Sequence, residues 1–156
     1  MDITTRLEFA AAPTEVYAML TDADFLDEVC QATASSSYDV DVAGSTTRTT
    51  RSFPAPDGVA RFTGSTLTVT EETVWGEPAT DGRRSANLQM NVQGQPVSMK
   101  GRLDLAPAGT GSVVQLTGDL KVSIPLLGKK LEQSTAPTVL AGFQKHQEVG
   151  SRWLAR

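Results

Sequence analysis

The one histidine of the sequence, His146, is the side chain best suited to proton transfer near neutral pH. An imidazole titrates near pH 6.5, so it can donate or accept a proton under physiological conditions. His146 lies near the centre of an apolar helical stripe in the last third of the chain. Three interpretations remain open: a packed and hydrogen-bonded helix residue, a polar anchor for a ligand, or a general acid or base. We favour the first and keep His146 as a weak candidate for catalysis.

Arg51 is the second unusual position. Counting back by twos from Phe53, which should face the interior, places Arg51 and Thr49 on the same side of a strand. A buried guanidinium needs a partner because its desolvation is costly. A ligand carboxylate or phosphate is one possible partner. We favour the alternatives, which are an edge strand, a bulge that reverses the register, or pairing with an acidic neighbour such as Glu71.

Acidic side chains occur in four close pairs along the sequence. Catalysis by two carboxyl groups requires that they face each other in different environments. Asp39 and Asp41 lie opposite an apolar face and should be solvated, whereas Asp22 and Asp24 suit helix capping. We therefore expect a structural role for every pair: Asp22 and Asp24, Asp27 and Glu28, Asp39 and Asp41, and Glu71 and Glu72.

Metal and cofactor motifs are lacking in the sequence. One histidine and one cysteine cannot supply a cluster of soft or imidazole ligands, and no calcium-loop spacing occurs. The Gly109-Thr110-Gly111 segment has no lysine or helix after it, so it reads as a hairpin turn and not as a phosphate loop. No nucleophile-elbow pentapeptide is present. Cys30 suits a small buried residue. We expect no metal and no cofactor.

Length and composition indicate an ordinary globular domain spanning residues 1–156. Of these residues, 39% are hydrophobic and 21% are charged, which is near the norm for such domains. No apolar run approaches the ~20 residues of a membrane helix, so we expect no integral membrane segment. The start of the chain has no signal-peptide pattern, and a lone cysteine agrees with a reducing compartment. We expect a cytoplasmic location.

The formal net charge of −4 disfavours nucleic acid as a partner. Binding to phosphates requires clustered lysine and arginine side chains. Here Arg48, Arg51 and Arg61 are spread through threonine-rich sequence, and Lys129 and Lys130 form the nearest cluster. The sequence leaves any protein partner unknown.

The elements that position these residues follow from hydrophobic periodicity. Residues 2–10 alternate between apolar and polar side chains, which predicts a half-buried strand. Pro13 then opens a short helix, and Thr21-Asp22 marks a break and the N-cap of a second short helix. From residue 35 to about 124 the chain alternates again, with turn residues near 43–44, 54–58, 76–82, 93–96 and 107–111. This pattern predicts an antiparallel sheet with one covered face.

The last segment changes to the helical period from residue 125 onward. Pro137 predicts a kink or break between a 126–132 piece and the main helix. The stripe that should face the sheet holds Val139, Phe143, His146, Gly150 and Trp153. The fold class is therefore α+β, with a curved antiparallel sheet wrapped around a long C-terminal helix. A curved sheet larger than its covering helix leaves a cavity between them.

Four short segments accompany this order of elements: the first strand running into 11–17 (AAPTEVY), 20–22 (LTD), 125–132 (PLLGKKLE) and 152–154 (RWL). With these segments in this order, the chain resembles the START-like superfamily, which is also called SRPBCC or the birch-pollen-allergen-like helix-grip fold. The resemblance covers the whole chain and includes a bacterial branch known as a domain of unknown function.

The resemblance implies a deep apolar tunnel between the sheet and the long helix. Relatives bind lipids, sterols, polyketides or quinones, and some cyclise, dehydrate or hydroxylate a bound molecule. The metal-binding pattern of the iron–sulfur oxygenase relatives is missing from this sequence, so that activity is not expected. The branch offers no catalytic residues that could be transferred.

Three functions remain open, and a carrier or binding protein is favoured over an enzyme. The first is binding of an apolar or amphipathic small molecule such as a lipid or polyketide. The second is a polyketide cyclase- or dehydratase-like enzyme with His146 as acid or base, and the third is a protein-interaction or chaperone-associated module. Soft and aromatic side chains are expected in the interior, among them Met19, Phe62 and Trp153. The predicted ligand-binding residues are Tyr38, Arg51, Met90, Met99, Val139, Phe143 and His146.

Overall fold

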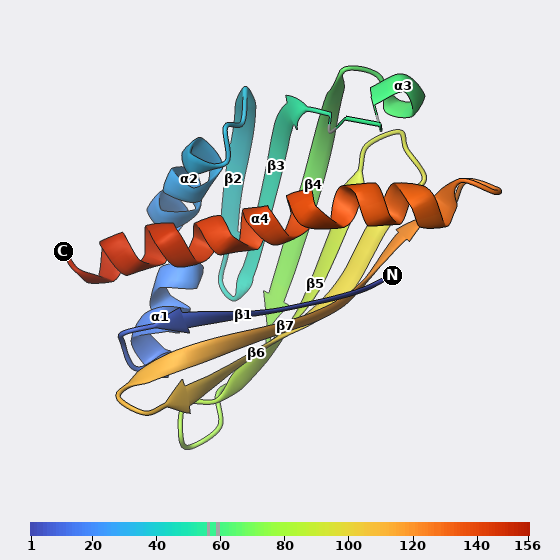
Figure 1. Ribbon diagram of the computed structural model, residues 1–156. Helices are drawn as coiled ribbons and strands as arrows, with labels where there is room; N and C mark the ends of the chain where they lie inside the picture. The colour runs from blue at the N-terminus through green and yellow to red at the C-terminus, as the bar shows by residue number, and fades with distance from the viewer. Residues whose placement is uncertain (56, 59) are drawn as a thin grey trace.

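The structure, a computed structural model, describes residues 1–55, 57–58 and 60–156, except for the side chain of Phe62. A seven-stranded antiparallel sheet is crossed on one face by a long helix (Figure 1). The elements along the chain are β1 (Asp2–Phe9), α1 (Pro13–Leu20), α2 (Ala23–Ala32), β2 (Ser37–Ala43), β3 (Thr46–Pro54), α3 (Ala60–Thr63), β4 (Thr66–Trp75), β5 (Arg84–Val92), β6 (Val97–Ala108), β7 (Gly111–Val122) and α4 (Gly128–Leu154). This is the predicted helix-grip architecture.

The strands lie in the order β1-β7-β6-β5-β4-β3-β2, and every neighbouring pair is antiparallel. Six consecutive strands form a meander, and β1 joins it at β7, where Asp2 lies opposite Asp119. Each of the five predicted turn regions falls between two of these strands. The short helix α3, between β3 and β4, was not predicted.

The alternation of side chains decides which face of the sheet is covered. In β1, Ile3, Leu7 and Phe9 are buried, while the residues between them are mostly exposed. The same period two runs through β5 and β7. Because one face is apolar, it packs against α4 and leaves the other face to solvent.

The two short helices after β1 begin as the sequence predicted. Pro13 occupies the first turn of α1, where its missing N–H has no cost. The side chain of Asp22 caps α2, because its Oδ1 accepts hydrogen bonds from the backbone N–H groups of Asp24 (2.8 Å) and Phe25 (3.4 Å). The buried face of α2 contributes Phe25 and Cys30 to the interior.

The long helix α4 runs without a break across Pro137, so the predicted break between a 126–132 piece and the main helix is wrong. A kink, the other predicted effect of Pro137, stays a prediction. Pro137 has no N–H to donate to the carbonyl of Gln133. Both residues are exposed, so water can hydrate that carbonyl and the helix continues. The sequence pattern located the proline but not the side of the helix on which it lies.

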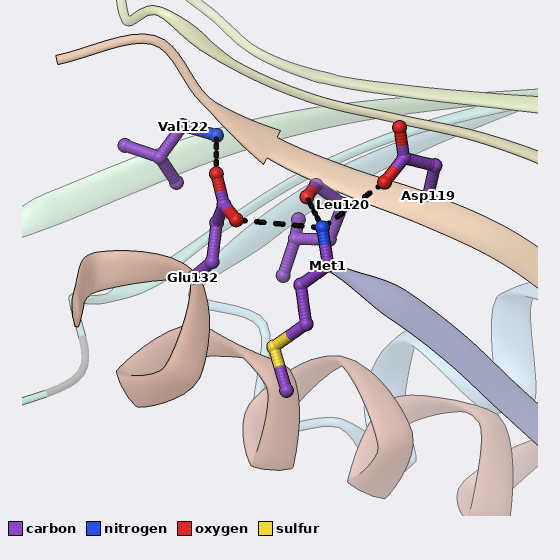
Figure 2. Close-up of polar contacts among 5 residues, drawn as sticks. All are labelled: Met1, Asp119, Leu120, Val122 and Glu132. Carbon is purple, nitrogen blue, oxygen red and sulfur yellow. Dashed lines mark hydrogen bonds and ion pairs between the residues drawn. The ribbon is translucent and has the colours of Figure 1, made fainter. Parts of the chain in front are cut away.

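The beginning of α4 is fixed to the sheet by the buried carboxylate of Glu132 (Figure 2). Its Oε2 accepts a hydrogen bond of 3.0 Å from the backbone N–H of Val122, at the end of β7. Its Oε1 lies 3.4 Å from the amino group of Met1, which also donates to Asp119 (3.0 Å) and to the carbonyl of Leu120 (2.8 Å). One carboxylate therefore joins β1, β7 and α4.

None of the helices in the described part of the chain has the length and apolar character needed to cross a membrane.

Candidate ligand-binding cavity

A cavity of about 330 Å³ lies between the inner face of the sheet and α4. Its floor includes parts of two neighbouring rows of residues on the sheet. Register places Glu71, Met90, Met99 and Leu120, on β4 to β7, in the first row. The second row holds Arg51, Val69 and Val92, on β3 to β5, and Val97 of β6 lines the cavity beside it. Both rows are polar or charged toward β3 and apolar toward β7.

The roof of the cavity comes from α4, including Val139, Gly142, Phe143 and His146. Gly142 lies inside the helix, where glycine is less favourable than alanine by about 1 kcal/mol. A Cβ atom added there would meet nothing within 4 Å, so close packing does not explain the glycine. Gly142 therefore leaves space beside the cavity, and it makes the helix less stable than an alanine would.

Arg51 and Glu71 form an ion pair at the polar end of the floor. Register places them diagonally on adjacent strands, since Thr49 lies opposite Glu71 and Arg51 lies opposite Val69. Arg51 Nη2 is 3.6 Å from Glu71 Oε2, and only 11% and 13% of the two side chains are exposed. Arg51 Nη1 also donates to the hydroxyl of Thr33, 3.1 Å away. Of the three alternatives that we favoured, the structure shows the pairing with Glu71, because β3 lies between β2 and β4 and its register is continuous through Arg51.

His146 lies above this pair, and its ring is fixed by contacts on α4 and α2. Its Nδ1 is 3.1 Å from the carbonyl oxygen of Gly142, one helical turn earlier. The ring stacks on Phe143 with 5.8 Å between centroids and meets the edge of Phe25 at 6.4 Å. The helical period of α4 therefore orients both the imidazole and the phenyl ring toward the sheet.

Burial lowers the pKa of His146 below its ordinary value of 6.5. The carboxylate of Glu71 and the hydrogen bond to Gly142 act in the opposite direction, and the charge of Arg51 adds to the effect of burial. The imidazole is therefore neutral at pH 7. Burial also raises the pKa of the Cys30 thiol to about 11, so this cysteine is protonated and unsuited to nucleophilic attack.

Two smaller cavities adjoin the polar end, with volumes of about 20 Å³ and 40 Å³. Glu71 and His146 line both of them as well as the large cavity, and Arg51 lines one of them. A space of about 10–15 Å³ is enough for one water molecule. The group Arg51, Glu71 and His146 therefore lies where the apolar cavity meets two water-sized spaces. We call these three residues the polar cluster.

The predicted ligand-binding residues fall into two groups. Six of the seven line the large cavity, from strands β3, β5 and β6 and from α4: Arg51, Met90, Met99, Val139, Phe143 and His146. Tyr38 lies elsewhere, on β2, where its hydroxyl accepts a hydrogen bond of 3.0 Å from Gln31 of α2. Whether any of these side chains contacts a ligand stays a prediction.

Glu71 is the cavity residue whose role sequence reasoning understated. It appeared there only as a possible partner of Arg51 and as half of an acidic pair. The two carboxylates of that pair point in opposite directions, and Glu72 forms an exposed ion pair with Arg48 at 3.5 Å. The available signal was the alternation of β4, in which Glu71 falls between the buried residues Val69 and Thr73. Phe62, expected in the interior, lies outside the described side chains.

No three histidine, cysteine, aspartate or glutamate side chains within the described ranges gather closely enough to hold a metal ion.

Solved structures similar to this one come from several proteins. A STAR-related lipid transfer protein from Xanthomonas axonopodis has a TM-score of 0.61 at 17% identity, over 93% of this chain and 82% of its own. A START superfamily protein from Mycobacterium smegmatis has a TM-score of 0.60 at 15% identity, over 98% of both chains. The di-domain ARO/CYC StfQ from the steffimycin biosynthetic pathway has a TM-score of 0.66 at 15% identity, over 97% of this chain and 49% of its own.

At such identities the similarity establishes the fold alone. No curated protein matches the sequence. A family model described as "Protein of unknown function (DUF2505)" matches residues 4–154. Because that match spans nearly the whole sequence, the chain belongs to the DUF2505 family, and its fold is the START-like helix-grip fold.

Proposed function

We propose that this protein binds an apolar or amphipathic small molecule in the cavity between the sheet and α4. The observation that carries this proposal is the cavity of about 330 Å³, whose wall is largely apolar and has the polar cluster at one end. Ligand sites in proteins share this composition, in which apolar walls supply affinity and a few polar groups fix orientation.

The cavity volume limits the size of the ligand. An engineered apolar cavity of about 150 Å³ accommodates benzene. A cavity of about 330 Å³ thus has room for roughly two such rings or a short chain of similar volume. Each 100 Å² of apolar ligand surface removed from water contributes about 2.5 kcal/mol, so a ligand of this size can bind with few polar contacts.

The titles of two of the similar solved structures also support the proposal. One is titled a STAR-related lipid transfer protein, and StfQ is titled an ARO/CYC of a biosynthetic pathway. Both names describe proteins that handle small organic molecules.

The direct test is native mass spectrometry of the purified protein, followed by organic extraction and analysis of the extract. We expect a mass above that of the polypeptide and a small organic molecule in the extract. Protein that stays ligand-free, both as purified and after incubation with apolar compounds of suitable size, would contradict the proposal.

A matched pair of variants locates the binding site. Val139→Trp places an indole in the cavity roof and should abolish binding or weaken it at least tenfold, because the space is occupied. Val74→Trp is the control, since Val74 is 44% exposed on the outer face of β4. Equal affinities in the two variants would place the ligand outside this cavity.

The polar cluster also supports a second candidate function, a cyclase- or dehydratase-like enzyme. A neutral imidazole beside a carboxylate and a guanidinium can take up a proton from a bound molecule. This function would be supported if the wild-type protein converts an extracted ligand to a product and the His146→Ala variant does not. The third hypothesis, a protein-interaction or chaperone-associated module that uses an exposed groove, would be favoured by a filled tunnel, whereas a cavity of about 330 Å³ lies there.

A further inference from the structure

The hydrogen bond of His146 determines which ring nitrogen carries the proton. The carbonyl of Gly142 can only accept, so Nδ1, which lies 3.1 Å from it, is the donor. A neutral imidazole has one proton, and Nε2 is then an acceptor. Among the described residues, no protein group donates a hydrogen bond to Nε2. His146 therefore contributes an acceptor without a protein partner to the wall of the cavity.

The other members of the polar cluster cancel each other's charge. Arg51 is positive and Glu71 is negative, and they lie 3.6 Å apart. The remaining charged residue of the cavity wall, Lys145, pairs with Glu148 at 2.9 Å, and both are partly exposed. A ligand carboxylate here would add an uncompensated negative charge close to Glu71, and burial makes such a charge costly.

We propose, on the basis of the proposed binding function, that the ligand is uncharged and carries a hydroxyl group that donates a hydrogen bond to Nε2 of His146. The apolar part of the ligand then lies along the floor toward Met90 and Met99. A hydroxyl has one proton to donate and two lone pairs to accept, so its oxygen can also receive a bond from Arg51. Neutral alcohols and phenols meet these requirements, whereas fatty acids and other carboxylates do not.

Three compounds with the same ring system separate the contributions of the apolar rings, a hydroxyl group and a carboxylate to the affinity. They are naphthalene, 2-naphthol and 2-naphthoate. Isothermal titration calorimetry at neutral pH measures the affinity of each. We expect 2-naphthol to bind roughly tenfold more tightly than naphthalene, since one hydrogen bond contributes about 1–1.5 kcal/mol and 1.4 kcal/mol corresponds to a factor of ten. We expect 2-naphthoate to bind more weakly than 2-naphthol.

Two substitutions attribute the preference to the imidazole. His146→Phe keeps a ring on Phe143 but removes the acceptor, so 2-naphthol and naphthalene should bind within about twofold of each other. His146→Gln keeps an acceptor oxygen and should retain part of the preference. Thermal unfolding checks that each variant is folded, and the wild-type comparison of the three compounds stands without them.

Each outcome is decisive. Tighter binding of 2-naphthoate, equal binding of 2-naphthol and naphthalene, or a preference that persists in His146→Phe would overturn the assignment of a hydroxyl ligand, while leaving the cavity as a binding site. If none of the three compounds binds saturably, this inference fails. The proposed binding function fails with it only if the protein also stays ligand-free in native mass spectrometry.

Discussion

A buried neutral histidine makes the stability of the folded protein depend on pH. His146 has its pKa lowered in the folded state, so the unfolded chain binds more protons below pH 6.5. The free energy of unfolding should therefore be constant above about pH 7 and should fall as the pH drops from about 6.5 toward the lower folded pKa. Denaturant titrations between about pH 5 and 8 measure this slope.

His146→Phe is the control for that slope, because it removes the titrating group and keeps an aromatic ring. The groups that face His146, namely Glu71 on β4 and Arg51 on β3, remain in this variant. The carboxyl pKa values of Asp104 and Glu132 are lowered from 3.8 and 4.5, so their effects appear at more acidic pH. An unchanged slope in His146→Phe would assign the pH dependence to another group.

Leu126 occupies a backbone conformation that disfavours leucine. Its φ angle is +68° and its side chain is fully exposed, so it gains nothing from burial. A left-handed conformation costs an L-residue about 1–2 kcal/mol, and glycine avoids that cost but loses more entropy on folding. We expect Leu126→Gly to raise the free energy of unfolding by about 0.5–1 kcal/mol, measured by denaturant titration.

The adjacent residue provides the comparison for that change. Leu127 is half-buried and packs against the cluster of Val122 and Leu131. The substitution Leu127→Gly should therefore destabilise the protein. The same direction of change at both positions would show that the backbone conformation does not decide the outcome.

At the scale of one element, two glycines of α4 should respond oppositely to alanine. At Gly150 a Cβ atom would lie 2.5 Å from Cε1 of Phe9 and 3.1 Å from Cε of Met19, so α4 can approach β1 and α1 only without a side chain there. We expect Gly150→Ala to destabilise by about 1–2 kcal/mol through overpacking. Gly142→Ala should stabilise by about 1 kcal/mol, because its surroundings are open.

Thermal unfolding of the two variants measures this difference, and each serves as the control for the other. Both substitutions improve helix propensity equally. A stabilisation in both cases would mean that α4 moves away from β1 at little cost.

At the scale of the whole molecule, Glu132 joins the first strand, the last strand and the covering helix. Glu132→Ala removes the partner of the buried N–H of Val122, and leaving such a group unsatisfied costs about 1–3 kcal/mol. Glu132→Gln keeps an acceptor oxygen and should cost less. Asp119→Asn, at an exposed ion pair, should change stability by less than about 1 kcal/mol.

The measurement is the free energy of unfolding of the three variants at neutral pH. The pKa of Glu132 is lowered, chiefly by the hydrogen bond from Val122, so its contribution should disappear as the pH falls through that lowered value. Equal effects of Glu132→Ala and Asp119→Asn would contradict the structural role of Glu132.

Most of the architecture could be predicted because each strand has one apolar face, and that pattern is local in sequence. Pro137 was misjudged because its effect depends on whether the carbonyl of Gln133 is hydrated, which only the folded helix decides. Arg51 could be placed on the inner face by its spacing. Its diagonal relation to Glu71 could not be derived, because the register of β3 and β4 depends on the turn between them. Tyr38 shares the predicted inner face of β2, yet that strand lies at the edge, beside α2.

The pairing of β1 with β7 has a consequence for synthesis on the ribosome. Asp2 cannot pair with Asp119 until Asp119 has been translated, which at about 5–20 residues per second is roughly 6–23 s later. Until then the apolar side of the first strand has no permanent partner, and α4 follows later still. A ligand cannot be enclosed before α4 has been translated. A nascent chain truncated before residue 128 should therefore bind no ligand.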